Sequence, residues 1–375
     1  MLRGDVPPVA APRLTPGTPG QAGLDAGELA ALVRTVDALP GRGWCGGVVV
    51  AAGRGPYLAV EHAAGWALRW VSADTEAADP EPVTVDTPFD LASLTKLVTA
   101  LLTVRQAERG VLELDAEVAR YLPEFGAAGK GRVTVRQLLT HTSGLAPQLP
   151  FHDGHGWELL WREPLTRTGP CYSDLGFLAL GRLLERVTGR PLDALVREEI
   201  TGPLGMAHTG YGPVPRAAAT EDQRRPRARA DRGLLRGVVH DENAHALGGV
   251  TGHAGLFGTA RDLAVLCRAL LTGGGPVLRP GSVALLLDAP GLGFAVDQPW
   301  FMGELAGRGA AGHTGFTGTS LVLDRASDTF LVLLATTVHP VRPAPPDSRP
   351  RATAATQLAR AARAACPAPG TDSAR

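Results

Sequence analysis

The chain has 375 residues, 37 basic and 37 acidic side chains, and an apolar fraction of 44%. A chain of this size can bury a sizeable core, and its charge balance lacks the basic excess typical of nucleic-acid or anionic-membrane binding. We therefore predict a globular protein with two units, or one unit with a large insertion, and no nucleic-acid or membrane partner. Its oligomeric state stays open.

The N-terminal segment and the cysteines suggest a cytoplasmic protein. Residues 1–22 are rich in Pro, Gly and Ala and lack the apolar core of a secretory signal, so we expect a flexible leader. No segment is long enough to span a membrane. The cysteines lie far apart without C-x-x-C spacing, which predicts reduced thiols rather than disulfides or a zinc site: Cys45, Cys171, Cys267 and Cys366. Cys171 is expected to be a small buried residue.

The first ninety residues are expected to form a helix and a few strands. Asp25 and Glu28 have the spacing of a capping box before a helix over 26–38. Apolar runs then predict antiparallel strands over 45–52, 57–61 and 66–71. The proline-rich run 79–88 is expected to be a connector.

A serine and a lysine then stand three residues apart at the start of a strongly patterned segment. Its apolar residues have the spacing of a helix with one buried face: Leu94, Leu97, Val98, Leu101 and Leu102. Gly110 is expected to end this helix. Residues three apart are helix neighbours, so the Ser93 hydroxyl and the Lys96 amine are expected to meet beside free N–H groups of the helix N-terminus. This arrangement could activate a nucleophile, or Lys96 could simply be solvated.

The middle of the chain is predicted to be mostly helical. A helical patch over 133–145 carries a turn at His141, and a loop is expected over 146–170. Tyr172 precedes a helix that ends at Gly189, and a further helix follows from Pro191 to Pro203. The arginine-rich run 213–236 is expected to be a solvated loop.

The last third begins with a glycine-rich run over 239–255, a composition typical of a loop near a ligand. His240, Asp241, Asn243 and His253 could be metal ligands, but their spacing matches no standard site. The remaining expected elements are a helix capped by Thr259 and ending at Leu271, strands over 319–324 and 330–336, a helix over 351–365 and a tail over 366–375.

Three short motifs follow one another in the order Ser93-x-x-Lys96, Tyr172-Ser-Asp174 and His313-Thr-Gly315. With the segments 138–145, 239–244 and 247–257, they make the chain resemble the serine β-lactamase and penicillin-binding-protein superfamily. The likeness is greatest to its class C-like branch, which includes β-lactamases, D,D-peptidases, esterases and amidases.

The resemblance implies a role for each residue of these motifs. Ser93 would attack a carbonyl to give an acyl-enzyme, with either Lys96 or Tyr172 as the base. The backbone N–H groups of Ser93 and Phe316 would form the oxyanion hole. Substrate binding would involve Asp174, His313, Thr314, Gly315 and Phe316, and no metal or other cofactor is required.

Two positions depart from the family pattern. His313 stands where many relatives have lysine, so a titratable group replaces a permanent charge for a substrate carboxylate. Asp174 stands where asparagine is common, and it could hold Lys96 by an ion pair and shift the base role toward Tyr172. Both departures predict weak binding of acidic β-lactams. We expect His141, in its turn, to fix a loop rather than to react.

We therefore expect an α/β fold, with an antiparallel sheet flanked by the first and last helices and an inserted helical domain. The sheet domain would span 23–90 and 235–365, the helical domain 91–234, with the site between them and substrate loops over 146–170 and 205–255. The expected function is a serine hydrolase acting on an ester, amide or peptide. An acyltransferase, D,D-peptidase, muropeptide amidase, weak β-lactamase or non-catalytic binding module are the alternatives.

Overall fold

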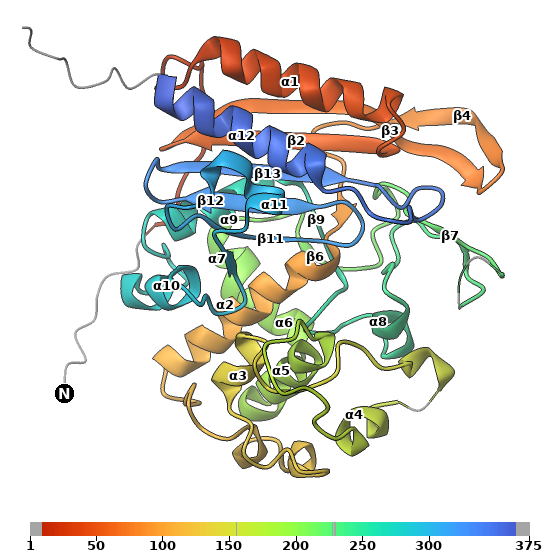
Figure 1. Ribbon diagram of the computed structural model, residues 1–375, viewed down its shortest axis with the longest axis vertical. Coiled ribbons are helices and arrows are strands. Elements are labelled where there is room, and N and C mark those ends of the chain that lie inside the picture. Colours follow the sequence, from red (N-terminus) through yellow and green to blue (C-terminus); the bar gives the residue numbers. More distant parts are fainter. Residues whose placement is uncertain (1–9, 155, 227, 229, 365–375) are drawn as a thin grey trace, which may run out of the picture.

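The computed structural model describes residues 10–154, 156–226, 228 and 230–364. An eight-stranded sheet, antiparallel except at one edge, separates two helical layers (Figure 1). The strand order is β1-β3-β2-β13-β12-β11-β10, with β4 paired to β3. The strands are β1 (Thr15–Pro16), β2 (Gly47–Arg54), β3 (Tyr57–Ser72), β4 (Thr75–Pro82), β10 (Ala295–Val296), β11 (Ala311–Thr314), β12 (Ser320–Asp324) and β13 (Thr329–Ala335).

The central strands β2 and β13 are buried on both faces. Val48 and Val50 of β2 pack into the core beneath the first and last helices, whereas Val49 and Ala51 belong to the core on the opposite face. Because side chains alternate between the faces of a strand, a strand covered on both sides must be apolar throughout. This explains the unbroken apolar run that predicted β2.

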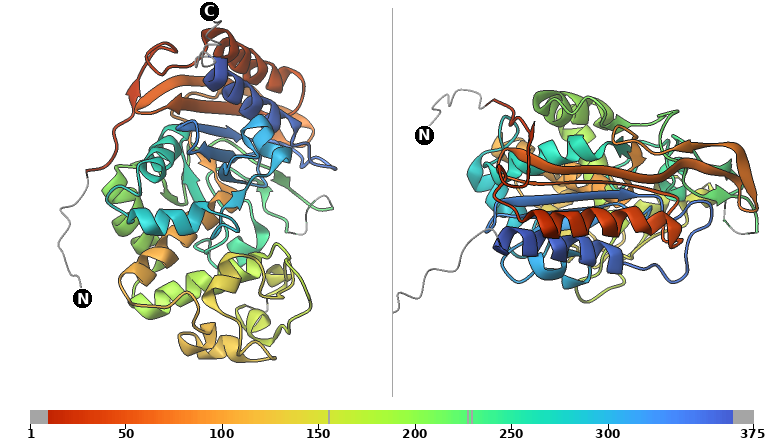
Figure 2. Two further views of the ribbon diagram at one scale, coloured as in Figure 1. Left: turned by 60° about the vertical axis from the view of Figure 1, so that its left-hand side comes forward. Right: turned by 90° about the horizontal axis from the view of Figure 1, so that it is seen from above.

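Helices α1 (Ala26–Gly41) and α12 (Arg349–Ala364) lie side by side on one face of the sheet (Figure 2). The Asp25 side chain caps α1 by accepting from Glu28 N–H at 2.9 Å. The other half of the predicted capping box is replaced, because the Asp25 N–H donates to the Ala361 carbonyl of α12 at 3.0 Å. The flanking helices and antiparallel sheet confirm the predicted fold class.

Two segments expected to be irregular contain strands. In the predicted leader, Thr15–Pro16 pair in parallel with β3, while residues 1–9 lie outside the described residues. Part of the predicted connector 79–88 belongs to β4, which is an edge strand and therefore tolerates Pro80 and Pro82. The two short strands expected over 57–71 are one continuous strand, β3.

The other helical layer contains the motif-bearing helices (Figure 1). Its helices are α2 (Thr95–Glu108), α3 (Val135–Leu139), α4 (Glu158–Arg162), α5 (Asp174–Thr188), α6 (Leu192–Val196), α7 (Gly202–Leu204) and α8 (Glu242–Ala246). Nearer the sheet lie α9 (Ala260–Leu271) and α10 (Pro280–Leu287), whereas α11 (Pro299–Met302) packs against α12 on the opposite face of the sheet. Small ladders join β5 (Phe89–Asp90), β9 (Leu256–Gly258) and β6 (Gly210–Tyr211), and also β7 (Asp222–Gln223) and β8 (Gly233–Leu234).

The strongly patterned helices α2, α5 and α9 agree with the sequence, and Thr259 caps α9 by accepting from the Asp262 N–H. The expected loop 146–170 is not wholly irregular, because it contains α4. The residue boundaries proposed for the two domains stay a prediction. Within the described ranges, no helix combines the length and apolarity needed to cross a bilayer.

Candidate active site

Ser93 and Lys96 meet as their spacing predicts. Ser93 lies in a 3₁₀ turn over Ala92–Leu94 that leads into α2, and the Lys96 Nζ donates to its Oγ at 2.9 Å. The Lys96 side chain is fully buried and also donates to the His253 carbonyl at 3.2 Å. Lys96 is therefore held in place by the protein, which excludes the interpretation of it as a solvated lysine.

The Lys96 amine carries a positive charge in this arrangement. Its Nζ lies 2.7 Å from Asp174 Oδ1, which confirms the ion pair expected from the sequence. Burial disfavours the charged form, but the attraction of Asp174 and then of Tyr172 outweighs burial and raises the pKa of Lys96 above its usual value. An ammonium group donates hydrogen bonds but cannot accept a proton, so Lys96 in this state is not a base.

Tyr172 lies in the loop before α5 and is 46% exposed. Its ring centroid is 5.0 Å from the Lys96 Nζ and 5.9 Å from the His313 ring centroid. The loop is anchored by His141, whose Nδ1 accepts from the Ser173 N–H at 3.0 Å and whose carbonyl accepts from the Cys171 N–H at 2.9 Å. These bonds confirm that His141 fixes a loop. Cys171 itself is half-buried rather than buried, because it lies at the margin of that loop.

His313 is a neutral group at this site. It is 8% exposed, and burial followed by the nearby Lys96 charge lowers the pKa of His313 to about 3. The same causes lower the pKa of His141 to about 4. His313 is therefore not a source of positive charge near neutral pH, because burial and Lys96 both oppose its protonation.

The turn after β11 is joined to the segment that carries Ser93. His313 and Thr314 end β11, and Gly315 and Phe316 begin this turn. Two turn hydroxyls donate to that segment: Thr317 Oγ1 to the Asp90 carbonyl at 2.8 Å and Thr319 Oγ1 to the Leu91 carbonyl at 3.1 Å. A Cβ on Gly315 would lie 2.0 Å from Thr319 Oγ1 and 2.6 Å from the Leu91 carbonyl oxygen. Glycine therefore permits the close approach that an oxyanion hole between Ser93 and Phe316 would need.

Asp90 is a residue that sequence reasoning missed. Its buried carboxylate accepts from the Ala92 N–H at 2.8 Å and from the His240 N–H at 2.6 Å. Ala92, immediately before Ser93, has a φ of 47°, in the left-handed region that favours glycine. Asp90 thus holds the unusual turn that presents Ser93, and the only signal in the sequence was an acidic residue inside the apolar run before Ser93.

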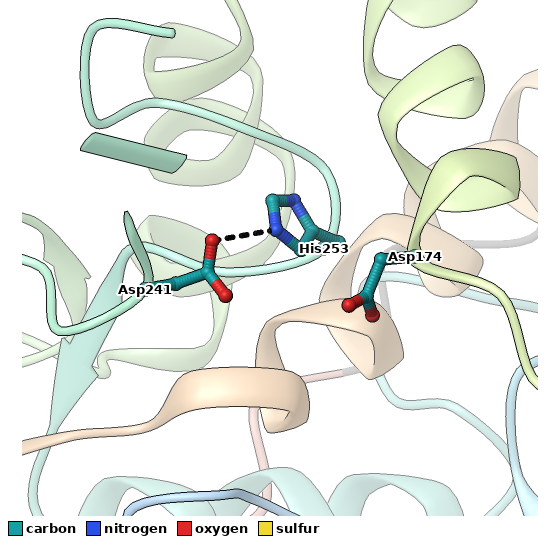
Figure 3. A group of neighbouring side chains, drawn as sticks. All are labelled: Asp174, Asp241 and His253. Carbon is teal, nitrogen blue, oxygen red and sulfur yellow. Dashed lines mark hydrogen bonds and ion pairs between the residues drawn. The ribbon is translucent and has the colours of Figure 1, made fainter. Parts of the chain in front are cut away.

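The possible metal ligands of the 239–255 segment do not all converge on one point, because they contact different partners. His240 contacts Glu221 at 2.9 Å, and Asn243 Oδ1 accepts from the Phe151 N–H at 3.1 Å. Asp241 and His253 form a pair at 3.0 Å, and Asp174 completes a group whose ligand atoms lie within 4.8 Å of one another (Figure 3).

Charge argues against a metal ion in this group. Asp174 already pairs with the Lys96 ammonium, and a cation bound by Asp174 would lie close to that positive charge. The Asp241 carboxylate is also engaged, because it caps α8 by accepting from the Ala244 N–H at 2.7 Å. We therefore interpret the group as two neighbouring pairs, Lys96 with Asp174 and His253 with Asp241.

A cavity of about 1100 Å³ opens at Ser93. Its lining includes the site residues Ser93, Tyr172, His313, Thr314, Gly315 and Phe316. The opposite walls come from α1, from α11 and from the segment 343–353 at the start of α12. Among the described residues, none from 146–170 or 205–255 lines this cavity. Both segments nevertheless contact site residues, because Gln148 Nε2 donates to Asp174 at 3.4 Å and the His253 carbonyl accepts from Lys96 at 3.2 Å. Their role in substrate binding stays a prediction.

Comparisons with known proteins identify the family of the chain. The family model described as Beta-lactamase matches residues 32–356. An Escherichia coli (strain K12) protein provisionally named D-alanyl-D-alanine carboxypeptidase is 33% identical over 310 residues, covering 69% of this chain and 71% of its own. A Bacillus subtilis (strain 168) N-acetylmuramyl-L-alanine amidase is 33% identical over 311 residues, covering 69% and 70%.

A solved structure extends the likeness to the fold. EstCE1, described as a hydrolase with promiscuous acyltransferase activity, superposes with a TM-score of 0.69 at 24% identity, covering 88% of this chain and 98% of its own. The family model spans most of the chain, from residue 32 to residue 356. The chain belongs to the beta-lactamase family.

Proposed function

We propose that this protein is a serine hydrolase that forms an acyl-enzyme on Ser93 with an ester or amide substrate. One observation carries the proposal, namely the 2.9 Å bond from the fully buried Lys96 amine to the Ser93 hydroxyl at the end of a large cavity. A nucleophile needs an adjacent group that controls its proton, and the family's hydrolases use a serine in this way. The backbone N–H groups of Ser93 and Phe316 then stabilise the oxyanion.

Tyr172 is the proposed general base. Because Lys96 is paired with Asp174 and charged, it cannot take the Ser93 proton. In its phenolate form Tyr172 can accept that proton and become the phenol, with the Lys96 ammonium 5.0 Å from the ring centroid. The proton then passes from Tyr172 to the leaving group, and water completes the hydrolysis.

The relatives suggest two substrate classes. The Bacillus subtilis relative is an amidase of N-acetylmuramyl-L-alanine, which favours a soluble muropeptide amide as the substrate of this protein. The second candidate is acyl transfer to an acceptor other than water, favoured by the open cavity and by the fold shared with EstCE1. The cytoplasmic location expected from the sequence stays a prediction that cell fractionation would check.

Active-site labelling tests the nucleophile. A fluorophosphonate probe should label Ser93, and Ser93→Ala should lose both labelling and turnover of p-nitrophenyl butyrate and of muropeptides. Ser282→Ala, at a helix position outside the cavity lining, is the matched control and should behave like the wild type. Persistent labelling of the Ser93→Ala variant at another serine would refute the assignment.

Acidic β-lactams should be poor substrates. Neutral His313 provides no cation for their carboxylate, and Asp174 adds a negative charge nearby. The ratio of kcat/KM for a chromogenic cephalosporin to that for p-nitrophenyl butyrate measures this preference. We expect a low ratio that rises in Asp174→Asn, and efficient cephalosporin turnover with negligible ester turnover would contradict it.

A further inference from the structure

His240 contacts both segments that would supply the oxyanion hole. It is 5% exposed, and its backbone N–H donates to the buried carboxylate of Asp90 at 2.6 Å. The same carboxylate accepts from the Ala92 N–H and so holds the turn that presents Ser93. The His240 ring meanwhile stacks on the Phe316 ring, with the two centroids 5.6 Å apart and the ring planes inclined by 29°. One residue therefore joins the Ser93 turn to the turn after β11.

The His240 ring is held by an acidic partner. Its Nε2 lies 2.9 Å from Oε2 of the buried Glu221. Burial raises the pKa of Glu221, but the bonds from His240 and Arg342 outweigh burial and lower that pKa to about 2, so the carboxylate is charged at neutral pH. Gln223 donates both to Glu221 at 3.2 Å and to the His240 carbonyl at 3.1 Å. The imidazole is thus fixed through its ring nitrogen and through its own backbone.

The Phe316 ring requires such support because it is 56% exposed. Exposed side chains in loops change rotamer readily, since few neighbours restrain them. The His240 ring restrains Phe316, and so does the Arg342 guanidinium, whose carbon lies 5.6 Å from the Phe316 ring centroid. Arg342 binds both oxygens of Glu221, so one buried carboxylate orients the two groups that contact the ring. Both kinds of contact favour a defined geometry, which fixes the ring and the turn that carries it.

We propose that His240 is a positioning residue, whose ring holds the backbone N–H of Phe316 at a fixed spacing from that of Ser93. This inference rests on the proposed function of the Ser93 site, because the two N–H groups matter only if a carbonyl oxygen becomes negative between them. Such donors are effective when they are in place before the reaction. His240 is not among the described residues that line the cavity, so it acts through the turn at Phe316 and not on the substrate.

Single-turnover kinetics of His240→Ala tests this role. The variant keeps the backbone bond to Asp90 but loses the ring that contacts Phe316 and Glu221. The acylation rate on p-nitrophenyl butyrate should fall roughly ten- to a hundred-fold, because misplacing an oxyanion donor costs less than the loss of about 10²–10³-fold on removing one. The dissociation constant of the ester should stay nearly unchanged, since the stabilisation is lost only in the transition state.

Two further variants accompany this measurement. His240→Phe keeps an aromatic ring against Phe316 without the bond to Glu221, so it should recover part of the lost rate. His62→Ala is the matched control, because it removes another histidine paired with a carboxylate, that of Asp37, outside the cavity lining. This control should keep the wild-type acylation rate.

A double-mutant cycle with Phe316→Ala separates positioning from a general loss of structure. Phe316→Ala keeps the backbone N–H but removes the ring, so His240→Ala should cost much less in that background than in the wild type. An equal cost in both backgrounds would overturn the proposal. Far-ultraviolet circular dichroism and Tm identify a variant that has lost its fold, and His240→Phe then replaces His240→Ala in the cycle.

The outcome also distinguishes this inference from the proposed function. Failure of the fluorophosphonate to label Ser93 in the wild type would refute the proposed function. An unaltered acylation rate in folded His240→Ala, with Ser93 labelled, would refute the role of His240 alone.

Discussion

Around Ser93, burial and the neighbouring charges determine the protonation state of each titratable side chain. Lys96 remains an ammonium because Asp174 offsets the cost of burying it, whereas at His141 and His313 burial and the Lys96 charge outweigh the attraction of Asp174 and lower the pKa of both imidazoles. Removing Asp174 would take away the main group that raises the pKa of Lys96. The Asp174→Asn variant therefore tests both the protonation state of Lys96 and the preference against acidic substrates.

The proposed roles of Tyr172 as the base and of Lys96 as the adjacent ammonium predict the rates of their variants. Tyr172→Phe and Lys96→Ala should each lower kcat by roughly 10²–10⁴-fold, the usual worth of general acid–base catalysis. Single-turnover kinetics on p-nitrophenyl butyrate measures the acylation step directly. Tyr121→Phe, whose hydroxyl accepts from the Glu113 N–H, is a matched control and should keep its rate. Near-normal rates in both site variants would contradict the proposed proton transfers.

Metal removal should leave activity unchanged. Asp174, Asp241 and His253 are grouped, but Asp174 is paired with Lys96 and Asp241 caps α8. Turnover of p-nitrophenyl butyrate before and after dialysis against a chelator provides the measurement, with metal content determined by mass spectrometry. Loss of activity that zinc restores would instead identify this group as a metal site.

At the scale of secondary structure, the helices with strong amphipathic spacing were predictable, whereas the edges of the sheet were not. Helix α9 buries one face, whereas residues 95–104 of α2 and 174–181 of α5 are buried on all sides, so the predicted single buried face of α2 is part of a fully enclosed helix. The edge strands β1 and β4 contain prolines and polar residues, and they are ordered by their pairing to β3 rather than by local propensity. Strand pairing between residues far apart in the sequence leaves little signal in a short stretch of residues.

The turn before α2 offers a prediction about its backbone. Ala92 has a φ of 47°, so Ala92→Gly should relieve strain and raise the free energy of unfolding by up to about 1 kcal/mol. Ala92→Val should be destabilising and should lower activity, because a β-branched side chain strongly disfavours a φ of 47° and would distort the turn that presents Ser93. Urea unfolding and ester turnover measure the two effects.

Ala128 provides the matched control for that backbone effect. It is exposed and has a similar φ of 53°, outside the cavity lining. Ala128→Gly should also be stabilising, and Ala128→Val should leave turnover unaltered. If Ala128→Val and Ala92→Val changed activity equally, the turn before Ser93 would have no special role.

Across the whole molecule, the motifs were predictable and the cavity walls were not. Ser93, Lys96, Tyr172 and His313 occur in short patterns of fixed order. Arg351, on the α12 wall of the cavity, gave no signal, because it is one arginine among many, and its burial depends on α12 packing beside α1 and on the turn at Gly315. For the same reason the sequence did not show that α1, α11 and the start of α12 line the cavity at Ser93.

Stability should fall as the pH is lowered below about 6.5. Unfolded histidines take up protons near that pH, whereas His313 and His141 resist protonation to about 3 and 4, and burial also lowers the pKa of His339. The unfolded chain therefore binds more protons in this window, which favours unfolding. Each such histidine contributes up to about 1.4 kcal/mol per pH unit to the slope.

Urea unfolding at pH 7.5, 6.0 and 5.0 measures this dependence. Acidic groups also titrate, including Asp90, whose pKa is raised by burial and which acts in the opposite direction. The comparison of the wild type with His313→Asn cancels their contribution, and the variant should show the shallower loss of stability. Parallel slopes for the two proteins would contradict the neutral state of His313.

The cavity at Ser93 cannot form until the C-terminal part of the chain has been synthesised, because β2 pairs with β13 and α12 forms one cavity wall. The nucleophile and its helix emerge in the first third of the chain, but β2 has no partner on that edge until β13 has been made. Arg351 and the α12 wall emerge later still. A nascent chain can therefore display Ser93 long before it has a cavity to hold a substrate, so hydrolysis should begin only once α12 has docked.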